Sequence, residues 1–302
     1  MRDIALKTLR AASLSIGMII SASGLSADTA PPVTRQAQSE PSKGVQPQVD
    51  KQTADAAAEK RKKLLADATA AIADTEKALQ ALQDKKNDEA LKALASVTGK
   101  IELIVARDPK LALAPVHTEV VTYDLFASLD TVKAAIKEAR KDLGDGEILK
   151  ARPLVAALAS EIQFRTTNIP LATYPVAIKA ITPLIDAGKI DEAKAQLEAA
   201  LNTLVVTTEV IPLPKLRAEN LLKEAQGLAE KKDRSKDEND KLAKLLTSAR
   251  QQLQLAEVLG YGKKKDYKSI YEQLEKIETA SAGGKSGAGW FDKIKKQLSE
   301  LF

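Results

Sequence analysis

A segment pattern that occurs three times constrains the fold of this chain more than any other feature of its sequence. The segments DKKNDEALKALASVTGKIELIVARDP, DGEILKARPLVAALASEIQFRTTNIP and AGKIDEAKAQLEAALNTLVVTTEVIP align without gaps when Pro109, Pro170 and Pro212 are superposed. Two internal positions then hold the same kind of residue, namely Ala90, Ala151 and Ala193 at one and Ile101, Ile162 and Leu204 at the other. Because Ala/Leu-rich helices align by chance, the shared prolines carry most of the argument. Their unequal spacing excludes a regular solenoid.

Each unit is predicted to be a helix, a polar turn, a second helix and an extended tail. The body is rich in helix formers with apolar residues three and four apart, and a first helix is expected over 53–83. The tails are rich in β-branched residues, although the first could equally continue a helix. We therefore expect a mainly α fold of helical hairpin repeats forming an up-down bundle. Short extended or β segments are expected around 101–106, 116–122, 162–167 and 204–211.

The start of the chain has the pattern of a secretory signal. Arg2, Lys7 and Arg10 precede an uncharged run of apolar and small residues, and we expect cleavage near 22–27 and a periplasmic location. The alternative is a signal anchor, but the run is short and diluted by Ser and Gly. Residues 28–50, rich in Pro, Gln and Ser, are expected to be a disordered leader to a helical domain over 51–280.

Composition and motifs argue against catalysis and against nucleic-acid binding. The chain has no Cys, only 3% aromatic residues and a formal net charge of +5, which is mild for a nucleic-acid binder. His117 is the only His, so neither a Ser-His-Asp triad nor a zinc site of common type is expected. No phosphate-binding glycine motif follows a predicted strand. We expect no enzyme activity, no cofactor and no metal.

The last residues form a separate amphipathic segment, 290–302, behind a Gly/Ser linker, 281–289. At 100° per residue, six apolar side chains fall within one arc of about 120°. They are Trp290, Phe291, Ile294, Leu298, Leu301 and Phe302. With Lys293, Lys295 and Lys296 as electrostatic support, this helix is predicted to bind an anionic membrane surface. Two alternatives are docking on its own core or a neighbouring subunit, and binding of unfolded clients.

Three segments give the chain a family resemblance. ARDPKLALAPVHTEVVTYDL, IPLATYPVAIKAI and EVIPLPKLRAENLL resemble the recurrent segments of the YfdX family of bacterial exported proteins, over about residues 58–280. The resemblance implies a mainly helical fold, oligomeric assembly and a role in envelope stress, including acid response, antibiotic tolerance and heat resistance. It implies no enzyme activity and supplies no catalytic residues.

These observations predict a non-enzymatic periplasmic protein that protects the envelope under heat or acid stress. The expected mechanism is that of a holdase-like chaperone, a homo-oligomer that covers unfolded clients and is tethered to the membrane by its C-terminal helix. The alternative is a small-ligand-binding or sensing protein with a pocket near His117, Tyr123 and Tyr174.

Overall fold

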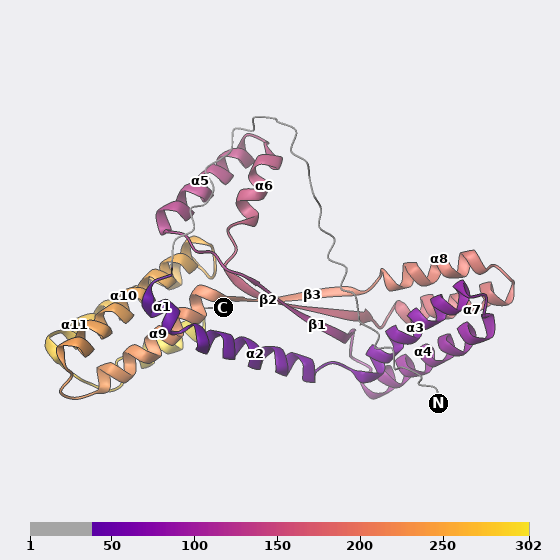
Figure 1. Cartoon of the computed structure of the whole chain (residues 1–302), viewed down its shortest axis with the longest axis horizontal. Coiled ribbons are helices and arrows are strands. Elements are labelled where there is room, and N and C mark those ends of the chain that lie inside the picture. Colours follow the sequence, from indigo (N-terminus) through magenta and orange to yellow (C-terminus); the bar gives the residue numbers. More distant parts are fainter. Residues whose placement is uncertain (1–37, 302) are drawn as a thin grey trace, which may run out of the picture. The chain divides into compact units, whose positions relative to one another are not determined.

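A computed structural model describes residues 38–301 (Figure 1). The expected mainly α class is confirmed, since the chain is 69% helical with 12 α-helices and one three-stranded sheet in the described part. The helices before the second strand are α1 Glu40–Gly44, α2 Gln46–Lys62, α3 Ala66–Gln83, α4 Asn87–Arg107, α5 Leu129–Gly144 and α6 Ile148–Ala156. Those after it are α7 Tyr174–Asp186, α8 Ile190–Leu201, α9 Leu213–Glu230, α10 Lys236–Val258, α11 Lys264–Ser281 and α12 Asp292–Ser299. The strands are β1 Leu113–Tyr123, β2 Glu161–Pro170 and β3 Val205–Pro212.

The threefold repeat consists of a helical hairpin followed by a strand: α3–α4–β1, α5–α6–β2 and α7–α8–β3. Each hairpin turn has one left-handed residue, and these residues, Lys85, Gly146 and Gly188, occupy the same position relative to the aligned prolines. In each turn the next amide donates to the carbonyl five residues earlier, for example Lys189 to Leu184 at 2.8 Å. This hydrogen bond is that of a Schellman turn, which satisfies the last carbonyls of the first helix.

The prediction of an extended segment at 101–106 is wrong, because these residues are helical and α4 continues to Arg107. Val97, Ile101 and Ile104 are buried at helical spacing, so packing decides the conformation in spite of the β-branched side chains. Strand β1 therefore begins after Pro109, whereas Pro170 and Pro212 end β2 and β3. The three other extended segments coincide with the three strands, except that Leu204 precedes the start of β3.

The sheet has the antiparallel order β1–β2–β3 and separates the hairpins. Leu113 pairs with Pro170 at one end of the β1–β2 ladder, and Tyr123 pairs with Glu161 at the other. The chain thus enters α7–α8 from the first end and α5–α6 from the second. Helices α3, α4, α7 and α8 share one apolar core and form a four-helix bundle, but α5–α6 is not part of it, so the expected single bundle is too simple (Figure 1).

The region before α3 differs from two expectations. Residues 40–50, expected to be disordered, form α1 and the start of α2, with Pro41 and Pro47 in the first turns, where proline fits. Val45 and Val49 are buried and supply the apolar contacts that the composition of 28–50 does not suggest. The expected helix 53–83 is broken at 63–65, where the Leu65 amide donates to the Pro115 carbonyl at 3.0 Å. The predicted signal, 1–27, and residues 28–37 lie outside the described residues.

Two further clusters complete the core. Val49 and Ala57 of α2 pack against Ile162, Phe164 and Leu213, which covers one face of the sheet. Helices α9, α10, α11 and α12 surround a second large cluster. In the described part of the chain, no helix has both the length and the apolar character needed to cross a bilayer.

Candidate functional site

The apolar face of the C-terminal segment packs against the protein itself. Phe291, Ile294 and Leu298 are at most 1% exposed and Leu301 is 7% exposed, within the cluster of α9, α10 and α11. Trp290 is half-buried on the same cluster, and Phe302 lies outside the described residues. The arrangement is therefore the one expected if the helix docks on its own core. Membrane binding through these side chains would require the helix to leave this cluster, and that prediction stays untested.

The polar face of α12 is exposed and carries the three lysines named from the sequence. Lys295 donates to Gln226 of α9 at 2.9 Å and lies 3.4 Å from Asp292. Lys296 lies 3.9 Å from Glu300. Gln297 also donates to Ser269 of α11 at 2.5 Å, so polar contacts on two sides orient the docked helix.

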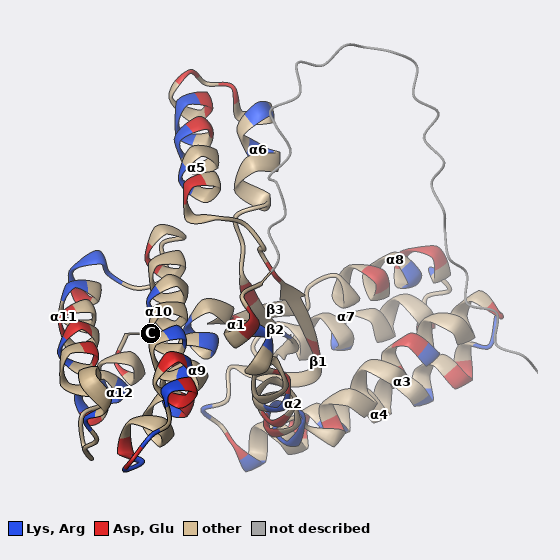
Figure 2. Ribbon diagram, turned by 60° about the vertical axis from the view of Figure 1, so that its left-hand side comes forward, with Lys and Arg blue, Asp and Glu red and all other residues tan. Residues whose placement is uncertain are grey.

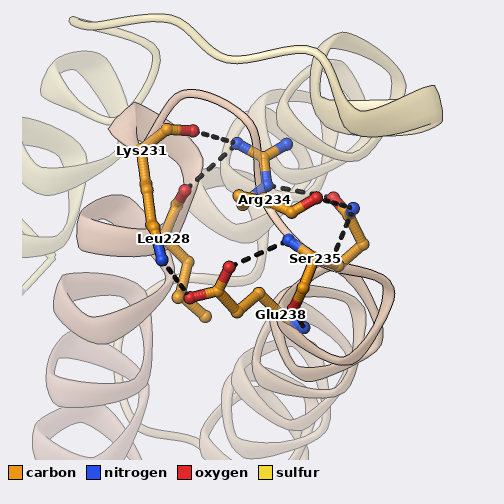
Figure 3. Close-up of polar contacts among 6 residues, drawn as sticks. Leu228, Lys231, Arg234, Ser235 and Glu238 are labelled. Carbon is orange, nitrogen blue, oxygen red and sulfur yellow. Dashed lines mark hydrogen bonds and ion pairs between the residues drawn. The ribbon is translucent and has the colours of Figure 1, made fainter.

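The segment before α12 is held by Arg234, which is 8% exposed (Figure 3). Its Nη1 donates to the carbonyls of Leu228 and Lys231, each at 3.1 Å, at the end of α9 (Figure 3). Its Nη2 donates to the Lys285 carbonyl at 2.6 Å. The charged stretch 231–240 therefore contains the buried cation that ties the predicted linker 281–289 to the core.

Trp290 packs closely on the backbone of this segment. A Cβ atom on Gly287 would lie only 2.4 Å from Cζ2 of Trp290. The Gly287 amide also donates to the Ala229 carbonyl at 3.2 Å. Only glycine leaves room for the indole in this arrangement, so a side chain at position 287 would displace Trp290.

The three residues of the alternative ligand pocket do not come together. Tyr174 is fully buried in the four-helix bundle and donates to Thr75 at 2.9 Å; burial raises its pKa. Tyr123 lies at the opposite end of β1 from this bundle and accepts a hydrogen bond from Arg165 at 2.8 Å. His117 is exposed in the middle of β1. The structure thus gives these side chains three separate surroundings.

The hairpin α5–α6 presents an apolar surface that the sequence did not reveal. Four of its large apolar side chains are exposed: Leu143 by 51%, Ile148 by 59%, Leu149 by 78% and Val155 by 52%. The residues buried in these two helices are mostly small, and the apolar ones are Val132, Ala135, Ala139 and Ala151. Helix α5 carries charges of both signs, whereas most of α6 is uncharged (Figure 2). A helix normally buries its large apolar residues, so this distribution makes the hairpin a candidate interaction surface.

Comparison with known proteins identifies the central part of the chain. Residues 71–210 match the sequence model of the family described as "YfdX protein". This central region of the chain is therefore a YfdX region. A solved structure of YfdX from Salmonella Typhi is similar, with 15% identity and a TM-score of 0.34 over 50% of this chain and 93% of that one. No curated protein matches the chain.

The resemblance inferred from the sequence is thus confirmed, over a shorter range than 58–280. The YfdX region contains nearly all of the three helix–helix–strand units, including the exposed hairpin α5–α6. Helices α9–α12, with Arg234 and the C-terminal segment, lie outside it. Among residues 38–301, His and acidic side chains nowhere form a group of three that could hold a metal ion.

Proposed function

We propose that the protein is a non-enzymatic stress-protection protein of the periplasm that acts as a holdase-like chaperone, with the α5–α6 hairpin as its client-binding surface. The YfdX match of residues 71–210 supports the general class. The observation that carries the mechanism is the exposure of Leu143, Ile148, Leu149 and Val155 on a hairpin whose buried apolar side chains are small.

A holdase needs exposed apolar area that does not collapse onto the protein itself. Burial of a large aliphatic side chain yields about 1.5–3 kcal/mol when complete, so four half-exposed side chains offer a few kcal/mol to a client. Small buried residues such as Ala135 and Ala151 let α5 and α6 approach closely without using the large side chains. Helices α5 and α6 therefore pack through small side chains, and the large exposed side chains remain available to a client.

Homo-oligomer formation is the second partnership that we propose, and it competes for the same surface. If copies of the chain cover α6 in each other, client binding requires their separation. The holdase mechanism then predicts that the activity per chain falls as the protein concentration rises above the dissociation constant of the oligomer.

The client surface can be tested by suppression of aggregation of heated citrate synthase at stoichiometric ratios. The double variant Leu149→Gln/Val155→Gln should lose most of the suppression. Val176→Gln, which changes an exposed valine on α7, should retain it. Because all three side chains are more than half exposed, thermal unfolding should hardly change. Equal suppression by the double variant and the wild type would contradict the assignment of the hairpin.

We also propose that the C-terminal helix tethers the protein to anionic membranes when it is released from α9 and α11. The reason is that one apolar face can be buried in protein or in lipid, but not in both. Co-sedimentation with phosphatidylglycerol vesicles should therefore be weak for the wild type and stronger for Gly287→Ala, which opposes docking. Absence of both proteins from the pellet at low salt would exclude the tether.

A further inference from the structure

A groove of about 620 Å³ lies between α5 on one side and α10 and α11 on the other. This volume suits a small molecule rather than a folded partner. The groove is separate from the exposed apolar surface of α6 and from the docked α12, and none of the residues singled out from the sequence lines it.

Four cationic side chains line the groove. Lys133, Lys137 and Arg140 follow one another along one face of α5, and Lys264 faces them from the start of α11. At about 1.5 Å of rise per residue, the three cations of α5 extend over about 10 Å. Within residues 38–301 none of the four has an ion-pair partner, whereas Lys141 on the same helix lies 3.8 Å from Glu138. These charges are therefore available to a ligand.

One carboxylate, Glu257, also lines the groove, and it already has a partner. The Tyr271 hydroxyl donates to Glu257 at 2.9 Å. Burial, together with the charge of Glu257, raises the pKa of Tyr271, so this hydroxyl stays protonated and keeps its hydrogen bond. The four cations outnumber this single carboxylate, which leaves the groove positive.

The remaining lining is largely apolar. Leu129 and Ile136 of α5 lie on one wall, and Val258 of α10 lies on the other. All three are half-buried. A bare inorganic anion would leave these side chains uncovered, and a neutral apolar molecule would leave the cations unused.

We propose that this groove binds an anionic amphiphile. Its phosphate or carboxylate is held by Lys133, Lys137, Arg140 and Lys264, and its alkyl chain covers Leu129, Ile136 and Val258. The ligand contacts both α5 and α11, so it joins the base of the hairpin to the C-terminal helices. This assignment does not depend on the holdase activity, because it rests on a different set of residues.

Calorimetric titration of the full chain with dodecyl phosphate, below the concentration at which it forms micelles, tests the proposal. We expect saturable binding that weakens at least about tenfold in Lys133→Gln/Lys137→Gln/Arg140→Gln, equivalent to about 1.4 kcal/mol. Lys141→Gln, a matched loss of charge outside the groove, should bind like the wild type. Ile136→Gln should weaken the binding of dodecyl phosphate and leave that of inorganic phosphate unchanged.

Two further arms separate the sources of the ligand. Inorganic phosphate should bind at least about tenfold more weakly than dodecyl phosphate, since it lacks the chain. Competition by phosphatidylglycerol vesicles would identify a lipid headgroup in a bilayer as a source, and its absence would identify a free amphiphile. Equal binding by the triple variant and the wild type, or no binding of dodecyl phosphate at millimolar concentration, would overturn the proposal.

Discussion

Arg217 joins three parts of the chain that are far apart in sequence. It is 2% exposed on α9 and donates to both carboxylate oxygens of Asp124, at 2.9 and 2.6 Å, just after β1. It also donates to Gln46 at the start of α2, at 2.9 Å. A buried guanidinium needs such a bidentate partner, because an unpaired charge in the interior costs several kcal/mol. The sequence places Arg217 in an amphipathic helix and gives no sign of this role.

Asp124→Asn should therefore destabilise the protein strongly. The buried Arg217 loses its counter-charge, and we expect the free energy of unfolding to fall by about 2–4 kcal/mol. Urea denaturation measures the change. Glu102→Gln is the control, since it removes an ion pair with Lys179 whose side chains are more than half exposed, and it should cost less than about 1 kcal/mol. Similar effects of the two substitutions would mean that the pairing of Arg217 with Asp124 stabilises the fold no more than an exposed ion pair does.

Asp74 should give stability a defined pH dependence. Burial raises the pKa of this carboxyl, but hydrogen bonds from Lys100 and from Ser96, the latter at 2.7 Å, outweigh it and hold the pKa below its ordinary value. The unfolded chain has the ordinary value, so this stabilisation is present above that value and is lost as the pH falls through the folded pKa.

Asp74→Asn should accordingly lower the free energy of unfolding by about 1–2 kcal/mol at pH 7. Below the ordinary pKa of Asp, about 3.9, the difference from the wild type should shrink. Parallel urea titrations of both proteins between neutral pH and pH 3 measure the difference. A difference that stays constant over this range would show that the ionised form of Asp74 is not stabilised by folding.

Among the elements, the repeated turns were the most predictable from the sequence. A polar turn was expected between the two helices of each unit, and each of these turns has its left-handed residue at the same position, namely Lys85, Gly146 and Gly188. The segment 101–106 was mispredicted because its β-branched residues favour a strand locally, whereas burial of Ile101 and Ile104 against neighbouring helices favours a helix. Local propensity does not contain this information, since it depends on which helices are present nearby.

The C-terminal segment shows the same division between what the sequence reveals and what it does not. The angular positions of Ile294, Leu298 and Leu301 define an apolar face without any structure. Which surface covers that face depends on Arg234 and Gly287, whose partners are other parts of the chain. The hairpin α5–α6 could be predicted as two helices, but the exposure of its large side chains could not, because it follows from how the hairpin packs.

Gly287→Ala should undock the C-terminal segment. Its Cβ would overlap the Trp290 ring, so the indole must move into water. Because Trp290 is the only Trp of the chain, its fluorescence emission should shift to longer wavelength. Gly227→Ala is the matched control, since a Cβ there meets no atom within 4 Å, and it should leave the emission unchanged. An unshifted spectrum in Gly287→Ala would contradict the docked arrangement.

On the scale of the whole molecule, the chain combines a YfdX region with a C-terminal helical region. The YfdX region, residues 71–210, supplies the three repeats and the exposed hairpin. The C-terminal region supplies the helices on which α12 docks and one wall of the basic groove. Large apolar side chains are thus exposed on α6 and buried on α12. The proposed binding of clients through the hairpin, with the C-terminal helix docked, requires this arrangement.

Amide hydrogen exchange of the full chain, with and without a permanently unfolded client, tests this account most directly. Reduced and carboxymethylated α-lactalbumin serves as the client. The account predicts that exchange in α6 slows when the client is added, while exchange in α3 and α4 is unchanged. Client binding without any slowing of exchange in α6 would contradict the account. Slow exchange in α6 without client, unchanged when the protein is diluted, would also contradict it.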